Sequence, residues 1–290
     1  MKRHPRRGTW SDRRAATRRR RLALLAALTL VGVAVTAALL LRDRGTTAGQ
    51  AAGRQAHPRN ASSAATPIAQ DSPDASRPPP PVVVRPTRGQ PLKLWIGGDS
   101  LGGELGWVLA PLVRDTHVIR PVTFYYVSSG FCRPDFFDWN AKVRQVMSGL
   151  RPGAVAIMVG TNDGQSVYDH GSWYAYGTSH WEQVYRRRVA DAMATMLAHG
   201  AERVYWVGMP PVGESWRSKR MATLDVIFSS EAATHPGVEY IDAWSLFADP
   251  EGHYQPTWRT ADGVHFTVTG QKRLAATVMT AIRRDYLTAP

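Results

Sequence analysis

The sequence of 290 residues contains a single cysteine, Cys132, and its nine histidines are scattered along the chain. One cysteine cannot form a disulfide within the chain, and no Cys/His cluster has the spacing of zinc ligands. We therefore expect a domain that is held together by its hydrophobic core and has no structural metal. Cys132 is expected to be a small buried apolar side chain.

Residues 92–290 lack net charge, although the whole chain carries a formal charge of +13. Ten Lys/Arg and one Asp lie in residues 1–21, and seven Arg and three Asp lie in residues 42–91. The remaining 19 basic and 19 acidic side chains balance each other. Because a nucleic-acid-binding domain carries a basic surface, this balance argues against a nucleic-acid partner.

Residues 22–41 form an uninterrupted run of 20 residues without charge. As a helix this run would span about 30 Å, the thickness of a bilayer core. Four arginines, residues 18–21, precede it, and the more basic flank stays in the cytoplasm. The pattern predicts a basic cytoplasmic tail over 1–21, a transmembrane signal anchor over 22–41 and a single-pass cell-membrane protein. A cleaved signal peptide is the alternative, although its apolar core usually has ~7–15 residues.

Residues 42–91 contain nine of the chain's 20 prolines, among small and polar residues. Such a segment cannot bury enough apolar surface to offset the loss of conformational entropy on ordering. It predicts a disordered linker that holds an extracytoplasmic domain away from the membrane.

From residue 92 onward, short apolar runs alternate with amphipathic stretches. The strand candidates are 92–96, 121–127, 154–159, 203–208 and 238–241. Apolar spacing predicts helices within 101–112, 143–150 and 189–197, and from about 269. This alternation predicts one α/β domain over 92–290, with a parallel five-stranded sheet covered on both faces. Ligands of such folds bind beyond the carboxyl ends of the strands.

Four polar motifs fall in the loops of this predicted domain. They are Gly98-Asp99-Ser100-Leu101, Ser128-Ser129-Gly130, Gly160-Thr161-Asn162-Asp163 and Asp262-Gly263-Val264-His265. Each motif alone also fits an ordinary turn or a helix N-cap. Together they supply the groups of a serine nucleophile site at the strand ends.

Ser100 is the candidate nucleophile, and a serine hydroxyl needs a base to accept its proton. His265 is the candidate base, and Asp262, three residues earlier, is placed to orient its imidazole. The backbone N–H groups of Ser100 and Gly130 and the side-chain amide of Asn162 are candidate donors for the oxyanion of a tetrahedral intermediate.

These motifs, in this order, resemble the sequence blocks of the SGNH/GDSL hydrolases over residues 92–288. The resemblance implies a flavodoxin-like three-layer α/β/α sandwich, no metal or other cofactor, and a serine esterase or acyl-transfer mechanism. It also implies a Ser100–His265–Asp262 triad with Ser100, Gly130 and Asn162 as the oxyanion hole. Residues 128–139 resemble a membrane-anchored bacterial branch of the family, whereas the Gly-, Tyr- and Trp-rich stretch 164–181 departs from many relatives.

Aromatic side chains in the 164–181 stretch are candidates for substrate contact. Trp173, Tyr174 and Tyr176 lie in a Gly/Ser-rich loop, where their rings suit stacking on a sugar or packing on an acyl chain. Arg133 is a candidate for binding an anionic group of the substrate. All four side chains also fit ordinary packing or a salt bridge.

The sequence thus predicts an extracytoplasmic serine esterase that acts on O-acyl esters, such as O-acetyl groups on a cell-envelope polysaccharide. An O-acyltransferase would use the same residues and pass the acyl group to a sugar hydroxyl. A non-catalytic carbohydrate-binding module is the alternative from another class. A binding module has no need of Ser100, Asn162, Asp262 and His265 together, which favours an enzyme.

Overall fold

The computed structural model describes residues 82–288. The predicted tail (1–21), the predicted transmembrane segment (22–41) and the linker up to residue 81 lie outside these residues. The linker's last ten residues, 82–91, form no helix or strand, and the backbone N–H of Val84 donates to Glu202 Oε2 at 3.0 Å. Between residues 82 and 288, no helix has the length and apolar character needed to cross a bilayer.

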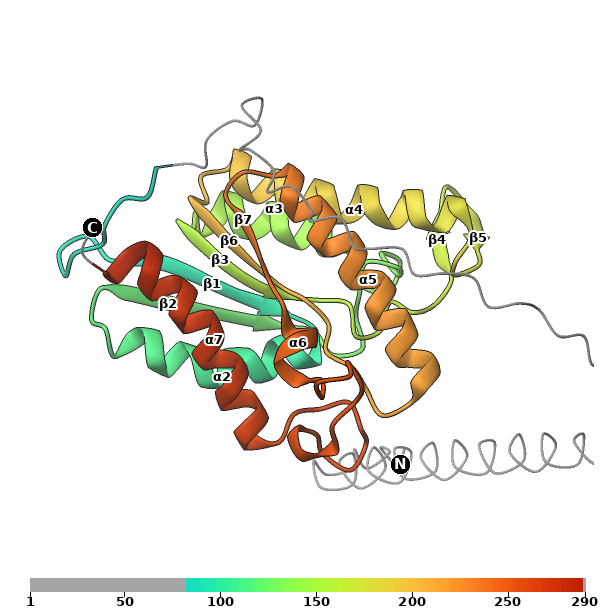
Figure 1. Cartoon of the computed structure of the whole chain (residues 1–290). Coiled ribbons are helices and arrows are strands. Elements are labelled where there is room, and N and C mark those ends of the chain that lie inside the picture. Colours follow the sequence, from blue (N-terminus) through green and yellow to red (C-terminus); the bar gives the residue numbers. More distant parts are fainter. Residues whose placement is uncertain (1–81, 289–290) are drawn as a thin grey trace, which may run out of the picture. The chain divides into compact units, whose positions relative to one another are not determined.

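A five-stranded parallel sheet forms the centre of the domain (Figure 1). In sheet order its strands are β2 (Ile119–Tyr125), β1 (Leu92–Gly98), β3 (Ala154–Met158), β6 (Arg203–Val207) and β7 (Val238–Ile241). The five predicted strands and their parallel pairing are confirmed. Counted along the chain, the order is 2-1-3-4-5, which is the flavodoxin-like order with its switch point between β1 and β3.

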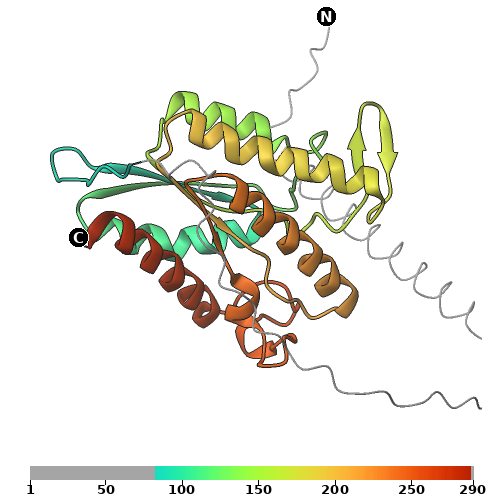
Figure 2. The ribbon, with the colours of Figure 1, turned by 45° about the horizontal axis from the view of Figure 1, so that its top comes forward.

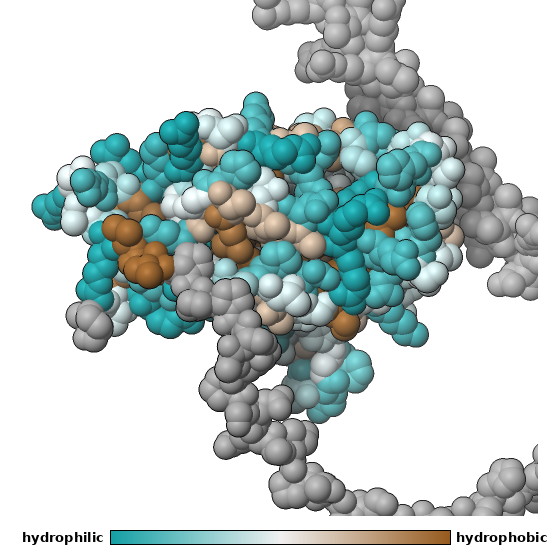
Figure 3. Space-filling model, turned by 90° about the horizontal axis from the view of Figure 1, so that it is seen from above, coloured by the Kyte–Doolittle hydropathy of each residue, from teal (hydrophilic) through white to brown (hydrophobic). Residues whose placement is uncertain are grey.

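Helices cover both faces of the sheet, which confirms the three-layer sandwich (Figure 2). On one face lie α2 (Ser100–Arg114) and α7 (Val268–Ile282), and on the other lie α3 (Trp139–Gly149), α4 (Ser179–Ala198) and α5 (Ser215–Thr234). The short helices are α6 (Ala243–Phe247), the 3-10 helix η1 (Pro256–Trp258) and the π-helical turn η2 (Arg283–Leu287). Seen from the side of α3 and α4, the surface is mainly hydrophilic with separate apolar areas (Figure 3).

The core lies between the sheet and its two helical layers. All five residues of β3 are buried, as expected for a strand in a sheet with both faces covered. Four tryptophans are almost fully buried: Trp95, Trp139, Trp181 and Trp206. Cys132 is also buried, as the sequence predicts.

The predicted loop over 164–181 is partly wrong, because it contains a small antiparallel hairpin. Its strands are β4 (Val167–Asp169) and β5 (Ser172–Tyr174), and α4 begins soon after, at Ser179. His170 and Gly171 link the two strands, with φ of +45° and +83°. Positive φ at both central residues is the geometry of a tight two-residue hairpin turn.

Candidate active site

Ser100, His265 and Asp262 lie in one hydrogen-bonded line. His265 Nε2 is 3.0 Å from Ser100 Oγ, and His265 Nδ1 is 2.6 Å from Asp262 Oδ2. The two ring nitrogens of the imidazole thus face a hydroxyl and a carboxylate. In this arrangement the carboxylate fixes the tautomer in which Nε2 accepts the hydroxyl proton.

The local sequence explains how Ser100 is presented. It is the first residue of α2, directly beyond the carboxyl end of β1, and Asp99 is the N-cap that accepts the N–H of Leu101 at 3.0 Å. The first N–H groups of a helix have no partner within the helix. The backbone N–H of Ser100 is therefore available to bind an oxyanion.

The turn from Asp262 to His265 holds the carboxylate and the imidazole together. Gly263 has φ of +70°, in the left-handed region that glycine adopts without strain. Asp262 Oδ1 accepts the N–H groups of Val264 at 2.9 Å and of His265 at 3.0 Å. Burial opposes ionisation of Asp262, but the hydrogen bonds from His265, Val264 and Thr260 outweigh it and hold its pKa well below the ordinary value.

Gly130 and Asn162 come from the loops that follow β2 and β3, the two neighbours of β1. Asn162 Nδ2 donates to the carbonyl of Ser129 at 3.0 Å, so the two loops meet beside Gly130. A Cβ at Gly130 would overlap the carboxylate of Asp163, which restricts this position to glycine. All three predicted oxyanion donors therefore lie at one edge of the sheet.

Two buried aspartates tie these loops together. Asp99 Oδ2 accepts the N–H groups of Gly160 at 3.1 Å and Thr161 at 2.9 Å, which joins the serine turn to the loop of Asn162. Burial raises the pKa of Asp99, and these backbone hydrogen bonds oppose the rise. The sequence motifs contain Asp99, but sequence reasoning gave it no role in the site.

Asp163 performs the same task for the loop of Gly130. Its carboxylate accepts the N–H groups of Phe131 and Cys132, both at 2.8 Å, and the hydroxyl of Tyr185 at 2.9 Å. Burial raises the pKa of Asp163 to about 6, against the effect of these hydrogen bonds. Its position in the motif after β3 was visible in the sequence, but its partners were not.

Glu104 and Arg259 support the segment that carries His265, and sequence reasoning did not single out either one. Glu104, one turn after Ser100 on α2, accepts the N–H of Phe266 at 3.0 Å. Arg259 is buried and donates to the carbonyls of Val264 at 2.9 Å and Pro211 at 3.1 Å. Glu104 could have been suspected because an acidic residue lies four positions from the serine on an otherwise apolar helix face.

The four predicted substrate contacts lie around the hairpin. Arg133 forms a salt bridge with Asp135, with 2.8 Å between Nη2 and Oδ2. Its guanidinium also lies 5.0 Å from the ring centre of Trp173, an exposed side chain on β5. The ring of Tyr174 lies against His180, with 3.6 Å between the ring centroids. Tyr176 contacts the ring of Trp181, with 4.6 Å between centroids, and lies 4.7 Å from the Arg220 guanidinium.

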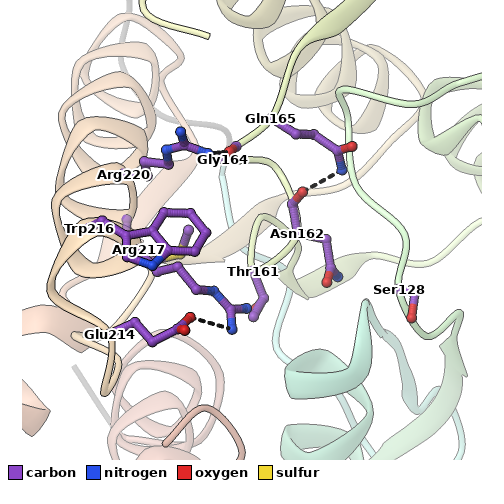
Figure 4. Close-up of a pocket in the computed structure, with 10 residues that line it drawn as sticks. Ser128, Thr161, Asn162, Gly164, Gln165, Glu214, Trp216, Arg217 and Arg220 are labelled. Atoms are coloured by element: carbon purple, nitrogen blue, oxygen red, sulfur yellow. Dashed lines mark hydrogen bonds and ion pairs between the residues drawn. The ribbon is translucent and has the colours of Figure 1, made fainter. Parts of the chain in front are cut away.

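A cavity of about 390 Å³ opens beside Asn162, between the loop after β3 and the start of α5 (Figure 4). It is lined by Ser128, Thr161, Asn162, Gly164, Gln165, Glu214, Trp216, Arg217, Arg220 and Met221. Of the predicted site residues, Asn162 lines it directly, and Tyr176 reaches it through Arg220. Within residues 82–288, no group of three or more His, Cys, Asp or Glu side chains could hold a metal ion.

Solved structures of other proteins share this architecture, although none of the curated proteins matches the chain. A GDSL-like lipase from Bacteroides thetaiotaomicron has a similar structure, with a TM-score of 0.51 and 18% identity, covering 70% of this chain and 92% of that one. The α/β hydrolase enzyme LAE5 from the metagenome of Lake Arreo, Spain, has a TM-score of 0.50 and 19% identity, covering 66% and 94%.

A third similar structure is a mutant of an acetyl-xylooligosaccharide esterase from Geobacillus stearothermophilus. Its TM-score is 0.50 at 16% identity, covering 69% of this chain and 97% of that one. The family DUF459, described as a protein of unknown function, matches residues 93–281. The chain therefore belongs to the DUF459 family, and its resemblance to the SGNH/GDSL hydrolases is confirmed at the level of the fold.

Proposed function

We propose that this protein is a serine esterase that cleaves O-acyl esters with Ser100 as the nucleophile. The observation that carries the proposal is the unbroken hydrogen-bonded line from Asp262 through His265 to Ser100. It joins a serine and a histidine that are 165 positions apart in the chain. A non-catalytic binding module would have no need of this alignment.

In the first half of the proposed reaction, Ser100 Oγ attacks the ester carbonyl carbon while His265 Nε2 takes the hydroxyl proton. The carbonyl oxygen becomes an oxyanion, bound by the N–H groups of Ser100 and Gly130 and by the amide of Asn162. Asp262 stabilises the imidazolium that forms. The carbon–oxygen bond to the alcohol then breaks, and the alcohol leaves with the proton from His265.

In the second half, water attacks the acyl-enzyme and His265 takes its proton, after which the acid leaves and Ser100 recovers its hydrogen. The side chains of His265 and Asp262 are 38% and 50% exposed, so water has access to the base. This exposure favours hydrolysis over transfer to a sugar hydroxyl, because an acyltransferase has to exclude water from the acyl-enzyme.

The substrate we propose is a short O-acyl group, such as O-acetyl, on a carbohydrate of the cell envelope. A long acyl chain needs a predominantly apolar pocket, whereas seven of the ten residues that line the cavity beside Asn162 are polar or charged. The similar structure of an acetyl-xylooligosaccharide esterase is in keeping with a sugar ester. An anchor at 22–41 would place the enzyme in the cell membrane, with its domain extracytoplasmic.

A fluorophosphonate probe, which reacts with activated serines, tests the proposal on the full-length protein. We expect labelling at Ser100, located by peptide mass, and loss of labelling in Ser100→Ala and His265→Ala. His253→Ala is a matched control, because His253 forms a similar pair with Asp249, with 3.5 Å between Nδ1 and Oδ2. It should label like the wild type.

Hydrolysis of p-nitrophenyl acetate should follow the same pattern as labelling. A wild-type protein that neither labels nor hydrolyses short acyl esters would refute the esterase and favour a carbohydrate-binding module. Labelling accompanied by acyl transfer to added oligosaccharides, at the expense of free acid, would favour the acyltransferase.

A further inference from the structure

The cavity beside Asn162 carries an excess of positive charge. Arg217 and Arg220 contribute two guanidinium groups, and Glu214 contributes the one carboxylate among the described residues that line it. All three come from the start of α5, opposite the loop of Asn162 (Figure 4). A substrate that enters this cavity meets a cationic wall.

The guanidinium groups of the two arginines differ in the contacts that they make within the protein. Arg220 donates to the carbonyl of Gly164 and lies 4.7 Å from the ring centre of Tyr176 and 4.8 Å from that of Trp216. Arg217 approaches Glu214 through Nη1, at 3.5 Å, which is well beyond the 2.7–2.9 Å of a charge-assisted hydrogen bond. Arg217 therefore has the donors with which to bind an anion from the substrate.

Trp216 is the largest apolar side chain that lines the cavity. It is 52% exposed, although the Arg220 guanidinium lies over its ring. Its flat indole can pack against the C–H face of a sugar ring. The other large apolar side chain in the lining is Met221.

We propose that this cavity binds the alcohol part of the ester as a sugar ring with a negatively charged carboxylate or phosphate. The charged group pairs with Arg217, and the ring lies against Trp216. The assignment rests on the proposed esterase function. It names the substrate class as anionic acylated sugars and Arg217 as the residue that selects them.

The test compares three methyl glycosides acetylated at the same hydroxyl, those of glucose, glucuronic acid and glucose 6-phosphate. We expect the full-length enzyme to prefer an anionic ester over the neutral one by about tenfold in kcat/KM, the effect of one hydrogen-bonded ion pair. The preferred anion distinguishes carboxylate from phosphate. Arg217→Gln should abolish the preference, whereas Arg114→Gln, at the far end of α2, should retain it.

Trp216→Ala should lower kcat/KM for all three esters by a similar factor. Trp107→Ala, which alters another tryptophan that is more than half exposed, on α2, should leave kcat/KM unchanged. Calorimetry with Ser100→Ala measures the same preference as a ratio of Kd values without turnover. Equal treatment of the three esters, or a preference that survives in Arg217→Gln, would overturn the assignment. Binding that depends on Arg217 without hydrolysis of any ester would refute the esterase and leave the anionic sugar site in place.

Discussion

Glu104 supports the position of His265 through a hydrogen bond to the backbone of the next residue, Phe266. Its carboxylate accepts the N–H of Phe266 and also faces His265, Asp262 and Arg259. Burial raises its pKa, and the hydrogen bond from Phe266 and the positive charges nearby oppose the rise. Its acceptor oxygen therefore holds the histidine segment in place, and a negative charge on Glu104 would stabilise the imidazolium of the proposed reaction.

Glu104→Ala should lower the free energy of unfolding by ~1–3 kcal/mol, because it leaves the buried N–H of Phe266 without an acceptor. Urea denaturation measures this loss. Glu104→Gln keeps an acceptor of the same size, so it should restore most of the stability while kcat/KM stays below that of the wild type. Glu251→Ala, at an exposed loop position, is the control and should change neither quantity.

Gly130 lies where there is no room for a side chain. A Cβ there would overlap the Asp163 carboxylate, which binds the N–H groups of Phe131 and Cys132. Gly130→Ala should therefore displace this loop, lower kcat by ~10²-fold through the loss of one oxyanion donor, and reduce stability.

Gly149→Ala is the matched control for this substitution. A Cβ at Gly149 on α3 would meet no atom within 4 Å, so the variant should be as active as the wild type. Alanine in a helix should also make it slightly more stable. Equal activity of the Gly130 and Gly149 variants would remove Gly130 from the oxyanion hole.

One buried carboxyl on α5 joins this helix to the carboxyl end of β6 and to β7. Asp225 Oδ1 accepts the N–H of Met209, just beyond β6, at 2.6 Å, and its carboxyl also meets the hydroxyl of Tyr240 on β7. Burial raises the pKa of Asp225 to about 8, although both hydrogen bonds oppose the rise. The folded protein therefore holds a proton here that the unfolded chain releases near pH 4.

Because of this proton, the free energy of unfolding should depend on pH. Between pH ~4 and 8 the folded state binds more protons at Asp225 than the unfolded state, so its contribution to stability falls as pH rises, by up to about 1.4 kcal/mol per unit. Asp225→Asn cannot ionise, so its stability relative to the wild type should increase from pH 5 to pH 8. Urea denaturation at several pH values measures the difference, and Asp191→Asn, on the exposed side of α4, should follow the wild type. If the free energies of unfolding of the wild type and Asp225→Asn changed in parallel with pH, the raised pKa of Asp225 would be contradicted.

The strands were predictable from the sequence because a doubly covered parallel sheet needs continuous apolar runs, as in Ala154–Met158. Helix α5 (Ser215–Thr234) was not predicted, because its buried residues are interspersed with polar ones and include Asp225. The hairpin β4–β5 was missed because its strands have three residues each, too few to show an alternating pattern. Its turn at His170-Gly171 was the one local signal.

In the site, sequence order and spacing sufficed to select Ser100, Asp262 and His265, which the fold brings into one line. Their supporting residues could not be found in the same way, since Glu104 and Phe266 are 162 positions apart. The cavity was missed for a related reason. Its two arginines belong to α5, a helix without a clear apolar repeat in the sequence, whereas the aromatic residues of 164–181 form a visible cluster.

Along the chain, the excess positive charge and the candidate site residues lie in different segments. The basic excess lies in residues 1–21 and 42–91, whereas every residue assigned to the site lies between residues 99 and 265. The ends of β1, β2 and β3 and the loop before α7 bring these residues to one edge of the sheet. Catalysis should therefore depend on the domain alone, and location on the N-terminal part.

A shortened protein that begins at residue 82 tests whether activity depends on the domain alone. It retains the contact of Val84 with Glu202, so we expect it to fold and to hydrolyse p-nitrophenyl acetate with a kcat/KM close to that of the full-length protein. The full-length protein should stay in the membrane fraction after alkaline carbonate extraction, because 20 uncharged residues at 22–41 suffice to span a bilayer. The shortened chain should be recovered in the supernatant.

The mass of the mature N-terminus separates the anchor from its alternative. An intact N-terminus on the membrane-bound protein supports the signal anchor, whereas a new N-terminus beyond residue 41 on a released protein shows a cleaved signal peptide. Because 42–81 is rich in proline, an anchored domain would act at a distance from the bilayer, up to about 120 Å if this part of the linker is fully extended as polyproline II. An anionic envelope polysaccharide within that reach would meet both the Ser100 nucleophile and the cationic wall of α5.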